Sequence, residues 1–156
     1  MVSKEVLYKF RFIVLILSLI AIDLFSKNLA VINLMYGQTE PTIFPFIDFL
    51  LIYNSGIAFG IFDSDNSLNS QILLLVTLAI SFYLIWMIAS EDILKKKYAL
   101  SIITAGAYGN IIDRAIDNKV TDFLHLEILD FSFFIFNLAD AFITIGAILL
   151  IYFELI

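Results

Sequence analysis

The chain has no cysteine, and His125 is the single histidine among its 156 residues. The lack of cysteine excludes disulfides, thiolate nucleophiles and cysteine-ligated metal sites. One histidine cannot build a His-rich metal centre, and a Ser–His–Asp triad would depend wholly on His125. The sequence therefore predicts no metal and no cofactor, and carboxylates are the groups that remain for catalysis.

Positively charged residues are also scarce. The chain has nine Lys and Arg against 15 Asp and Glu, which gives a net charge of −6. A protein that binds nucleic acid neutralises phosphates with a basic patch, so this balance argues against nucleic acid as a partner. Apolar residues are in excess, at 62% of the chain, and the mean hydropathy is +0.99. Soluble domains are about 45–50% apolar. The composition therefore indicates an integral membrane protein.

Long apolar runs separate the more polar parts of the chain. A helix of about 20 residues crosses the ~30 Å hydrocarbon layer, so a chain of this length has room for about four spans. The runs predict transmembrane helices at about residues 12–34, 70–89, 99–115 and 132–154. The first run follows basic residues, as in a secretory signal peptide, but Asp23 and Lys27 interrupt it, which favours a span. We expect residues 1–156 to form a single membrane domain.

Residues 36–66 differ from the apolar runs. They hold both prolines and several glycines, and they alternate aromatic and β-branched residues with turn residues. This pattern is typical of short strands, and it predicts a small sheet at the membrane surface between the first two helices. The polar residues 116–131 are expected to form a short loop or helix between the last two.

Lysine and arginine placement predicts the orientation. With four spans, the basic residues of the N-terminus and the lysines at 95–97 fall on one side of the membrane. That side is expected to be cytoplasmic by the positive-inside rule, together with both termini. Residues 36–66 and 116–131 then lie on the other, extracytoplasmic side.

Polar residues recur at helical spacing in the last two spans, at Asn110, Asp113, Arg114, Asn137 and Asp140. Ionisable groups at membrane depth are costly, so they face a bundle interior or a water-filled site. The predicted orientation brings them to the outer end of their helices, at the level of Asn54 and Asp122 in the outer segments. The sequence therefore predicts one polar site at the outer rim of the membrane.

Two carboxylates in one pocket do not both ionise easily, so one keeps a proton while the other draws a proton from water. This is the chemistry of an aspartic protease. The candidate pair comes from Asp113, Asp122 and Asp140, and spacing alone does not choose between them. Asp113 has Arg114 beside it, which favours permanent ionisation and a structural role, so Asp122 and Asp140 are preferred. Asp23 and Lys27, at i and i+4, are interpreted as a structural ion pair.

Several short motifs, in chain order, resemble those of a known family. They are DLFSK (23–27), NSGIAFG (54–60), GAYGNIIDR (106–114), VTDF (120–123) and FNLAD (136–140). Each motif alone is weak, but the set in this order within four spans is specific. The set is similar to that of lipoprotein signal peptidase, also called signal peptidase II.

The resemblance implies an all-α membrane protein with four transmembrane helices and an extracytoplasmic β-cradle at about residues 36–66. It implies an aspartic endopeptidase of the bacterial cytoplasmic membrane, with its active site on the extracytoplasmic side. The expected substrates are prolipoproteins that carry diacylglyceryl on a cysteine, cleaved on the N-terminal side of that cysteine. No cofactor is implied, membrane lipid surrounds the protein, and a monomer is expected.

The family's roles transfer to this chain motif by motif. The catalytic pair falls on Asp122 and Asp140. Positions that bind substrate or support the site fall on Asn54, Gly56, Asn110, Arg114 and Asn137. Asp23, Lys27 and Asp113 match structural polar positions.

Other functions compete with this interpretation. Intramembrane Asp, Lys and Arg also mark ion paths, so a small proton-coupled or ion-conducting transporter is the main alternative. Four spans without an evident inverted repeat make it less favoured. A presenilin-type protease would show a Gly-x-Gly-Asp signature, which the chain lacks. A structural subunit with buried polar pairs is the third alternative.

Overall fold

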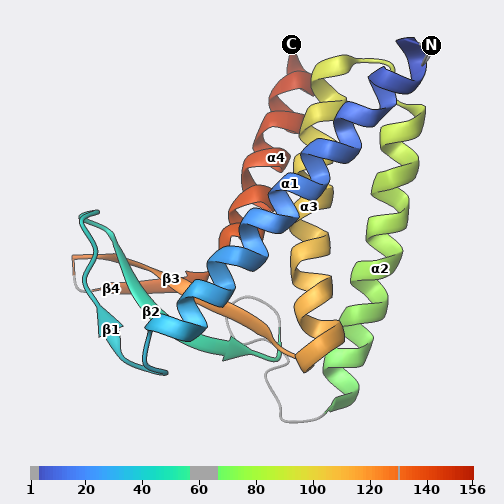
Figure 1. Ribbon diagram of the computed structural model, residues 1–156. Helices are drawn as coiled ribbons and strands as arrows, with labels where there is room; N and C mark the ends of the chain where they lie inside the picture. The colour runs from blue at the N-terminus through green and yellow to red at the C-terminus, as the bar shows by residue number, and fades with distance from the viewer. Residues whose placement is uncertain (1–3, 57–66, 130) are drawn as a thin grey trace.

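The computed structural model describes residues 4–56, 67–129 and 131–156. Within these ranges the elements are α1 (Lys4–Asn33), β1 (Thr39–Glu40), β2 (Ile47–Asn54), α2 (Ser67–Ser90), α3 (Leu94–Asp117), β3 (Val120–Ile128), β4 (Phe131–Phe136) and α4 (Leu138–Leu155). The helices form an elongated bundle, both termini lie at one of its ends, and the sheet projects from the side near the other end (Figure 1).

Among the described residues, three helical segments are long and apolar enough to cross a membrane: Phe10–Asn33, Gln71–Ser90 and Leu138–Leu155. The helix α3 is less apolar because it carries the lysines at 95–97 and the polar motif around Asn110. It packs against each of the other three helices, and most of its residues from 99 to 111 are buried. Its environment is therefore protein on several sides, which explains its small and polar side chains.

The glycines of α3 allow two neighbouring helices to approach it closely. A Cβ atom on Gly106 would collide with the carbonyl oxygen of Ala139, and one on Gly109 would collide with the carboxylate of Asp23. Small residues at such positions let helix backbones come together in membranes. Gly106 and Gly109 therefore serve close helix packing.

The four strands form one antiparallel sheet in the order β1-β2-β3-β4. In its register Ile52 lies opposite Asp122 on β2 and β3, and Leu124 lies opposite Phe136 on β3 and β4. The sheet packs on α1, where Leu51 and Phe123 are buried against Ala30. This contact fixes the position of β3 relative to the helix bundle.

The segment between the last two helices differs from the prediction. A loop or short helix was expected in residues 116–131, but Val120–Ile128 is a strand of the sheet. Both Asp122 and Phe123 on this strand are buried, and consecutive residues of a strand point to opposite faces, so both faces of the sheet are covered here. The sheet therefore combines two strands that precede α2 with two strands that lie between α3 and α4, and is not formed by residues 36–66 alone. Residues 57–66 of that predicted segment lie outside the described residues.

The prediction that the fourth span begins at about residue 132 is also wrong. Residues 132–136 form part of β4, and α4 begins at Leu138. The aromatic and β-branched run pairs with β3, and Asn137 then begins the helix as its N-cap. The Asn137 side chain accepts a hydrogen bond from the backbone N–H of Asp140, whose carboxylate accepts one from the N–H of Asn137. This capping box satisfies N–H groups that the first helical turn leaves free.

Candidate functional site

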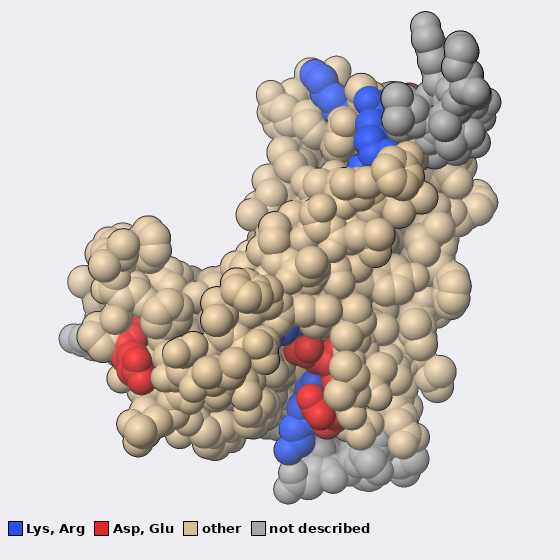
Figure 2. Space-filling view, in the orientation of Figure 1, with Lys and Arg blue, Asp and Glu red and all other residues tan. Residues whose placement is uncertain are grey.

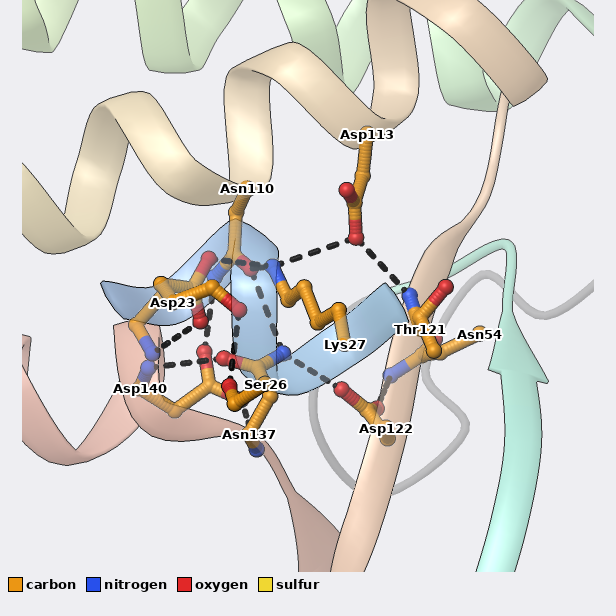
Figure 3. A network of polar contacts seen from close by, with 11 residues as sticks. Asp23, Ser26, Lys27, Asn54, Asn110, Asp113, Thr121, Asp122, Asn137 and Asp140 are labelled. Atoms are coloured by element: carbon orange, nitrogen blue, oxygen red, sulfur yellow. Dashed lines mark hydrogen bonds and ion pairs between the residues drawn. The ribbon is translucent and has the colours of Figure 1, made fainter. Parts of the chain in front are cut away.

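A polar network lies where the sheet meets the helix bundle (Figure 3). Its members come from different elements: Asp122 from β3, Asn54 from the end of β2, Asn110 from α3, and Asn137 and Asp140 from the start of α4. Figure 2 shows acidic and basic side chains gathered in the hollow between the sheet and the bundle. The fold thus joins segments that are distant in sequence at one place.

Asp122 is buried, with 1% of its surface exposed. One carboxylate oxygen accepts a hydrogen bond from the Asn54 amide at 3.0 Å, and the other accepts one from the Asn137 amide at 2.6 Å. Both donors are neutral side chains, so they orient the carboxylate without fixing it in its charged form. The geometry therefore allows Asp122 to be either protonated or ionised.

Burial is the main cause, and the nearby charge of Asp140 the next, that raise the pKa of the Asp122 carboxyl from an ordinary value of 3.8 to about 7. The hydrogen bonds from Asn54 and Asn137 and the charge of Lys27 act in the opposite direction. A group with such a pKa is present in both protonation states near neutral pH. This is what a proton-transfer residue needs.

Asp140 lies in the first turn of α4, and its carboxylate accepts a hydrogen bond from the Asn110 amide at 2.8 Å. The Asn137 side chain connects the two acids, since its amide nitrogen donates to Asp122 and its oxygen accepts from the backbone N–H of Asp140. One asparagine thus sets the position of Asp122 relative to Asp140.

A cluster of charged residues supports these two acids from the side of α1. The ammonium group of Lys27 lies 2.8 Å from a carboxylate oxygen of Asp23 and 3.1 Å from one of Asp113. It also donates to the side-chain oxygen of Asn110 at 3.0 Å. The ion pair between Asp23 and Lys27 expected from their spacing is present, and Asp113 and Asn110 of α3 also contact Lys27.

Asp23 has a second partner that sequence analysis missed. Its carboxylate accepts a hydrogen bond at 2.8 Å from the backbone N–H of Ala139, in the first turn of α4. Gly109 leaves the space that this carboxylate occupies. The spacing of polar residues in the sequence could not predict this contact, because the donor is a backbone N–H group, which every residue except proline has. The contact fastens α1 to the helix start that carries Asp140.

Asp113 and Arg114 are neighbours in sequence but have different partners. Asp113 contacts Lys27 and accepts a hydrogen bond at 3.0 Å from the backbone N–H of Thr121, next to Asp122. Arg114 donates to the carbonyl oxygen of Gly56 at 2.9 Å, while the N–H of Gly56 donates to the Asn54 side chain. Arg114 thus supports the segment that orients Asn54.

A cavity of about 520 Å³ opens onto Asp122 and Asp140. Its polar lining includes these acids, Asn54, Asn110, Arg114 and Thr144. Most of the remaining lining is apolar and comes from β4 and α4, including Phe134, Phe136, Ile143 and Ile145. Sequence analysis missed this apolar wall because it assigned the β4 residues to a helix.

The geometry suits activation of water. The cavity is lined by two carboxylates, and the pKa of the buried one, Asp122, is raised to about 7. A water between them could lose a proton to one acid while an electrophile is polarised by the other. The apolar wall beside them suits a ligand with an apolar part.

Comparisons with known proteins match this chain to one family. A family model described as "Signal peptidase (SPase) II" matches residues 15–156. A lipoprotein signal peptidase of Pelagibacter ubique (strain HTCC1062) is 38% identical over 146 residues, which cover 92% of this chain and 86% of the relative. Another, of Polynucleobacter necessarius subsp. necessarius (strain STIR1), is 35% identical over 146 residues, with coverages of 93% and 89%.

A solved structure has the same fold. A bacterial membrane enzyme determined by the in meso method superposes with a TM-score of 0.82 at 28% identity, over 93% of this chain and 87% of that one.

Proposed function

The chain belongs to the signal peptidase II family, and on that premise we propose that it cleaves prolipoproteins with Asp122 and Asp140 as its catalytic pair. The family supports a peptidase that acts on the signal peptides of lipoproteins. The observation behind the proposed pair is the hydrogen bonding of Asn137, which joins both acids at one cavity.

In the proposed reaction Asp140 is ionised and Asp122 holds the resting proton. Asp140 takes a proton from water, the hydroxide attacks the carbonyl carbon of the peptide bond, and Asp122 donates its proton to the carbonyl oxygen. Asp140 then protonates the amide nitrogen, Asp122 recovers its proton from the hydroxyl, and the C–N bond breaks. The raised pKa of Asp122 supports this assignment.

The surrounding residues are proposed to position these acids. Asn137 and Asn110 orient Asp140, and Asn54 and Asn137 orient Asp122, through the hydrogen bonds described above. Arg114 acts through its contact with Gly56. Preorganised groups of this kind lower the reorganisation that a transition state requires.

The membrane arrangement is part of the proposal. We take α3 as the fourth span of a multi-pass protein of the bacterial cytoplasmic membrane, with the sheet as an extracytoplasmic β-cradle. Both termini lie at one end of the bundle, and lysine and arginine side chains gather at that end (Figures 1 and 2). That end is cytoplasmic under the positive-inside rule, and the catalytic pair then lies on the extracytoplasmic side. A monomer is sufficient, because one chain supplies the whole network.

The proposed substrate carries diacylglyceryl on the cysteine that follows the scissile bond. Ile143 and Ile145 of α4 and the aromatic residues of β4 offer an apolar wall beside the acids, which suits such a substrate. Purified protein is expected to cleave a diacylated lipobox peptide on the N-terminal side of the cysteine and to leave the unacylated peptide intact. Mass spectrometry of the products measures both. Equal turnover of the two peptides would contradict the acyl requirement, and proton flux without cleavage would favour a transporter.

Cleavage is expected to depend on the proton of Asp122. Because its pKa is raised to about 7, the protonated form is lost as pH rises through that value. The kcat/KM for the diacylated peptide should therefore fall about tenfold per pH unit well above neutrality. Initial rates between pH 5 and 9 measure this, with circular dichroism as the control for folding. A flat profile across neutral pH would contradict the assignment of the resting proton.

A further inference from the structure

A second polar cluster lies on the sheet, and the catalytic proposal does not use it. It consists of Asp48 on β2 with His125 and Glu127 on β3. We propose that these three side chains bind a divalent metal ion of the Zn²⁺ class. The proposal stands independently of the peptidase activity.

The strand register brings the three side chains together. Asp48 lies directly opposite His125 in the antiparallel pair of β2 and β3. Glu127 is two residues after His125, and side chains at this spacing share a face of a strand. One ligand atom from each residue lies within 4.8 Å of the other two. The three ligands are therefore within reach of a single ion after small side-chain adjustments.

The environment of the His125 side chain supports a metal site independently of the strand register. The residue is buried, with 5% of its surface exposed, and its Nε2 atom lies 2.7 Å from the hydroxyl of Ser132. Its Nδ1 atom is also buried, and it has no hydrogen-bond partner among the described residues. A buried polar atom without a partner carries a desolvation penalty, so such atoms call for an explanation.

A shared metal ion explains the position of Nδ1. A carboxylate oxygen of Glu127 lies 3.6 Å from Nδ1, which is beyond hydrogen-bond distance. Two ligands at about 2.1 Å from a tetrahedral Zn²⁺ lie ~3.4 Å apart, close to this separation. The contact of Nε2 with Ser132 would hold the ring with Nδ1 toward the ion, as outer hydrogen bonds do for histidine ligands.

The donor set selects the class of ion. One imidazole and two carboxylates, with water in the fourth position, form a mixed nitrogen and oxygen ligand set that suits Zn²⁺. The negative charges of the two carboxylates would neutralise the charge of the ion. Mg²⁺ prefers oxygen ligands in an octahedral arrangement and binds imidazole poorly. The sequence predicted no metal because it has one histidine and no cysteine, but the sheet supplies two carboxylates beside that histidine.

The cluster is separate from the catalytic cavity. His125 is three residues after Asp122 on the same strand, about 10 Å along it and on the other face. An ion bound there would join β2 to β3 and would stabilise the folded sheet by mass action. It would not touch the reacting atoms, so peptide cleavage is expected without it.

Isothermal titration of the full chain in detergent, after removal of metals with EDTA, tests the proposal. Wild type is expected to bind one Zn²⁺, and its melting temperature should rise with Zn²⁺ concentration. His125→Gln keeps a polar group for Ser132 but removes the Nδ1 ligand. It should weaken Zn²⁺ binding by about 100-fold, since loss of a ligand costs at least as much as loss of an outer-shell partner.

Glu40→Gln is the matched control, because it removes a carboxylate of the same sheet outside the cluster, on an exposed residue of β1. It should bind Zn²⁺ like wild type. If His125→Gln does not fold, Glu127→Gln and Asp48→Asn provide the same comparison. Equal Zn²⁺ affinity in wild type and the folded cluster variants would overturn the proposal, as would equal affinity of wild type for Mg²⁺.

Discussion

Asp140→Asn is expected to abolish peptide cleavage while the protein still folds and inserts. The amide cannot take a proton from water, and loss of general base catalysis alone lowers rates by about 10²–10⁴-fold. The Asn110 amide can still donate to the oxygen of the new side chain. The capping hydrogen bond from the N–H of Asn137 is lost, because the amide nitrogen that replaces Oδ2 cannot accept it, and this costs roughly 1 kcal/mol. Turnover of the diacylated peptide by purified, folded variant measures the effect.

Asp122→Asn should lose cleavage to a similar extent, and its effect on stability should depend on pH. The raised pKa of Asp122 means that the folded state holds a proton which the unfolded chain releases at lower pH. This contribution is complete below pH 4 and is lost as pH rises through about 7. The asparagine has one acceptor oxygen for the two amide donors, so one hydrogen bond is lost at every pH. Because wild type loses the contribution of the Asp122 proton at high pH, the melting temperature of the variant should fall less relative to wild type at pH 8 than at pH 5.

Asp117→Asn is the matched control for both variants. It removes an exposed carboxylate at the end of α3, outside the network, and should cleave at the wild-type rate. A folded Asp140→Asn or Asp122→Asn that cleaves near the wild-type rate would show that the catalytic pair is assigned wrongly. A folded but inactive Asp113→Asn would point to Asp113 instead.

The membrane character and the position of the polar motifs could be predicted because both are local in sequence. Apolar runs reveal helices by length and composition alone, and the spacing of Asp23 and Lys27 places them on one helix face. The motif residues lie in one network because helix ends and strand ends meet at the same end of the bundle. Hydropathy and the distribution of charged residues were enough to predict that the motif residues lie at the same end of the bundle.

The β3–β4 hairpin could not be predicted in the same way. The run FSFFIF is as apolar as a helix start, and its partner is β3, a strand that was itself assigned to a loop. Helix and strand are ambiguous for short apolar runs, and pairing between strands decides the outcome. The apolar wall of the cavity was lost from the prediction for the same reason. Asp122 likewise lies on a strand and not on the expected loop.

Contacts between side chains of different helices also could not be predicted from the sequence. Arg114 follows Asp113 directly and was taken as its charge partner, but Lys27, from another helix, contacts Asp113. A contact between α1 and α3 depends on how closely the helices pack, which Gly109 permits. Sequence spacing reports neighbours on one helix and does not report such contacts between helices.

Lys27→Met is the variant expected to destabilise the fold most. The substitution keeps an unbranched side chain of similar length but removes the cation between Asp23 and Asp113. The Asp23 side chain is fully buried, and breaking a buried ion pair by removing one partner costs about 3–5 kcal/mol. Asn110 also loses the donor to its side-chain oxygen. Melting temperature and the yield of folded protein in detergent measure the loss.

Lys96→Met is the matched control, because Lys96 also forms an ion pair between two helices, with Glu154, whose side chain is 67% exposed. Exposed pairs contribute about 0–1 kcal/mol, so this variant should melt close to wild type. Addition of Asp23→Asn to Lys27→Met should recover much of the lost stability. The asparagine oxygen can still accept from the N–H of Ala139 while the unpaired charge is gone. If Lys27→Met alone melted like wild type, the cluster would not hold α1 against α3 and α4, and the position of Asp140 would need another support.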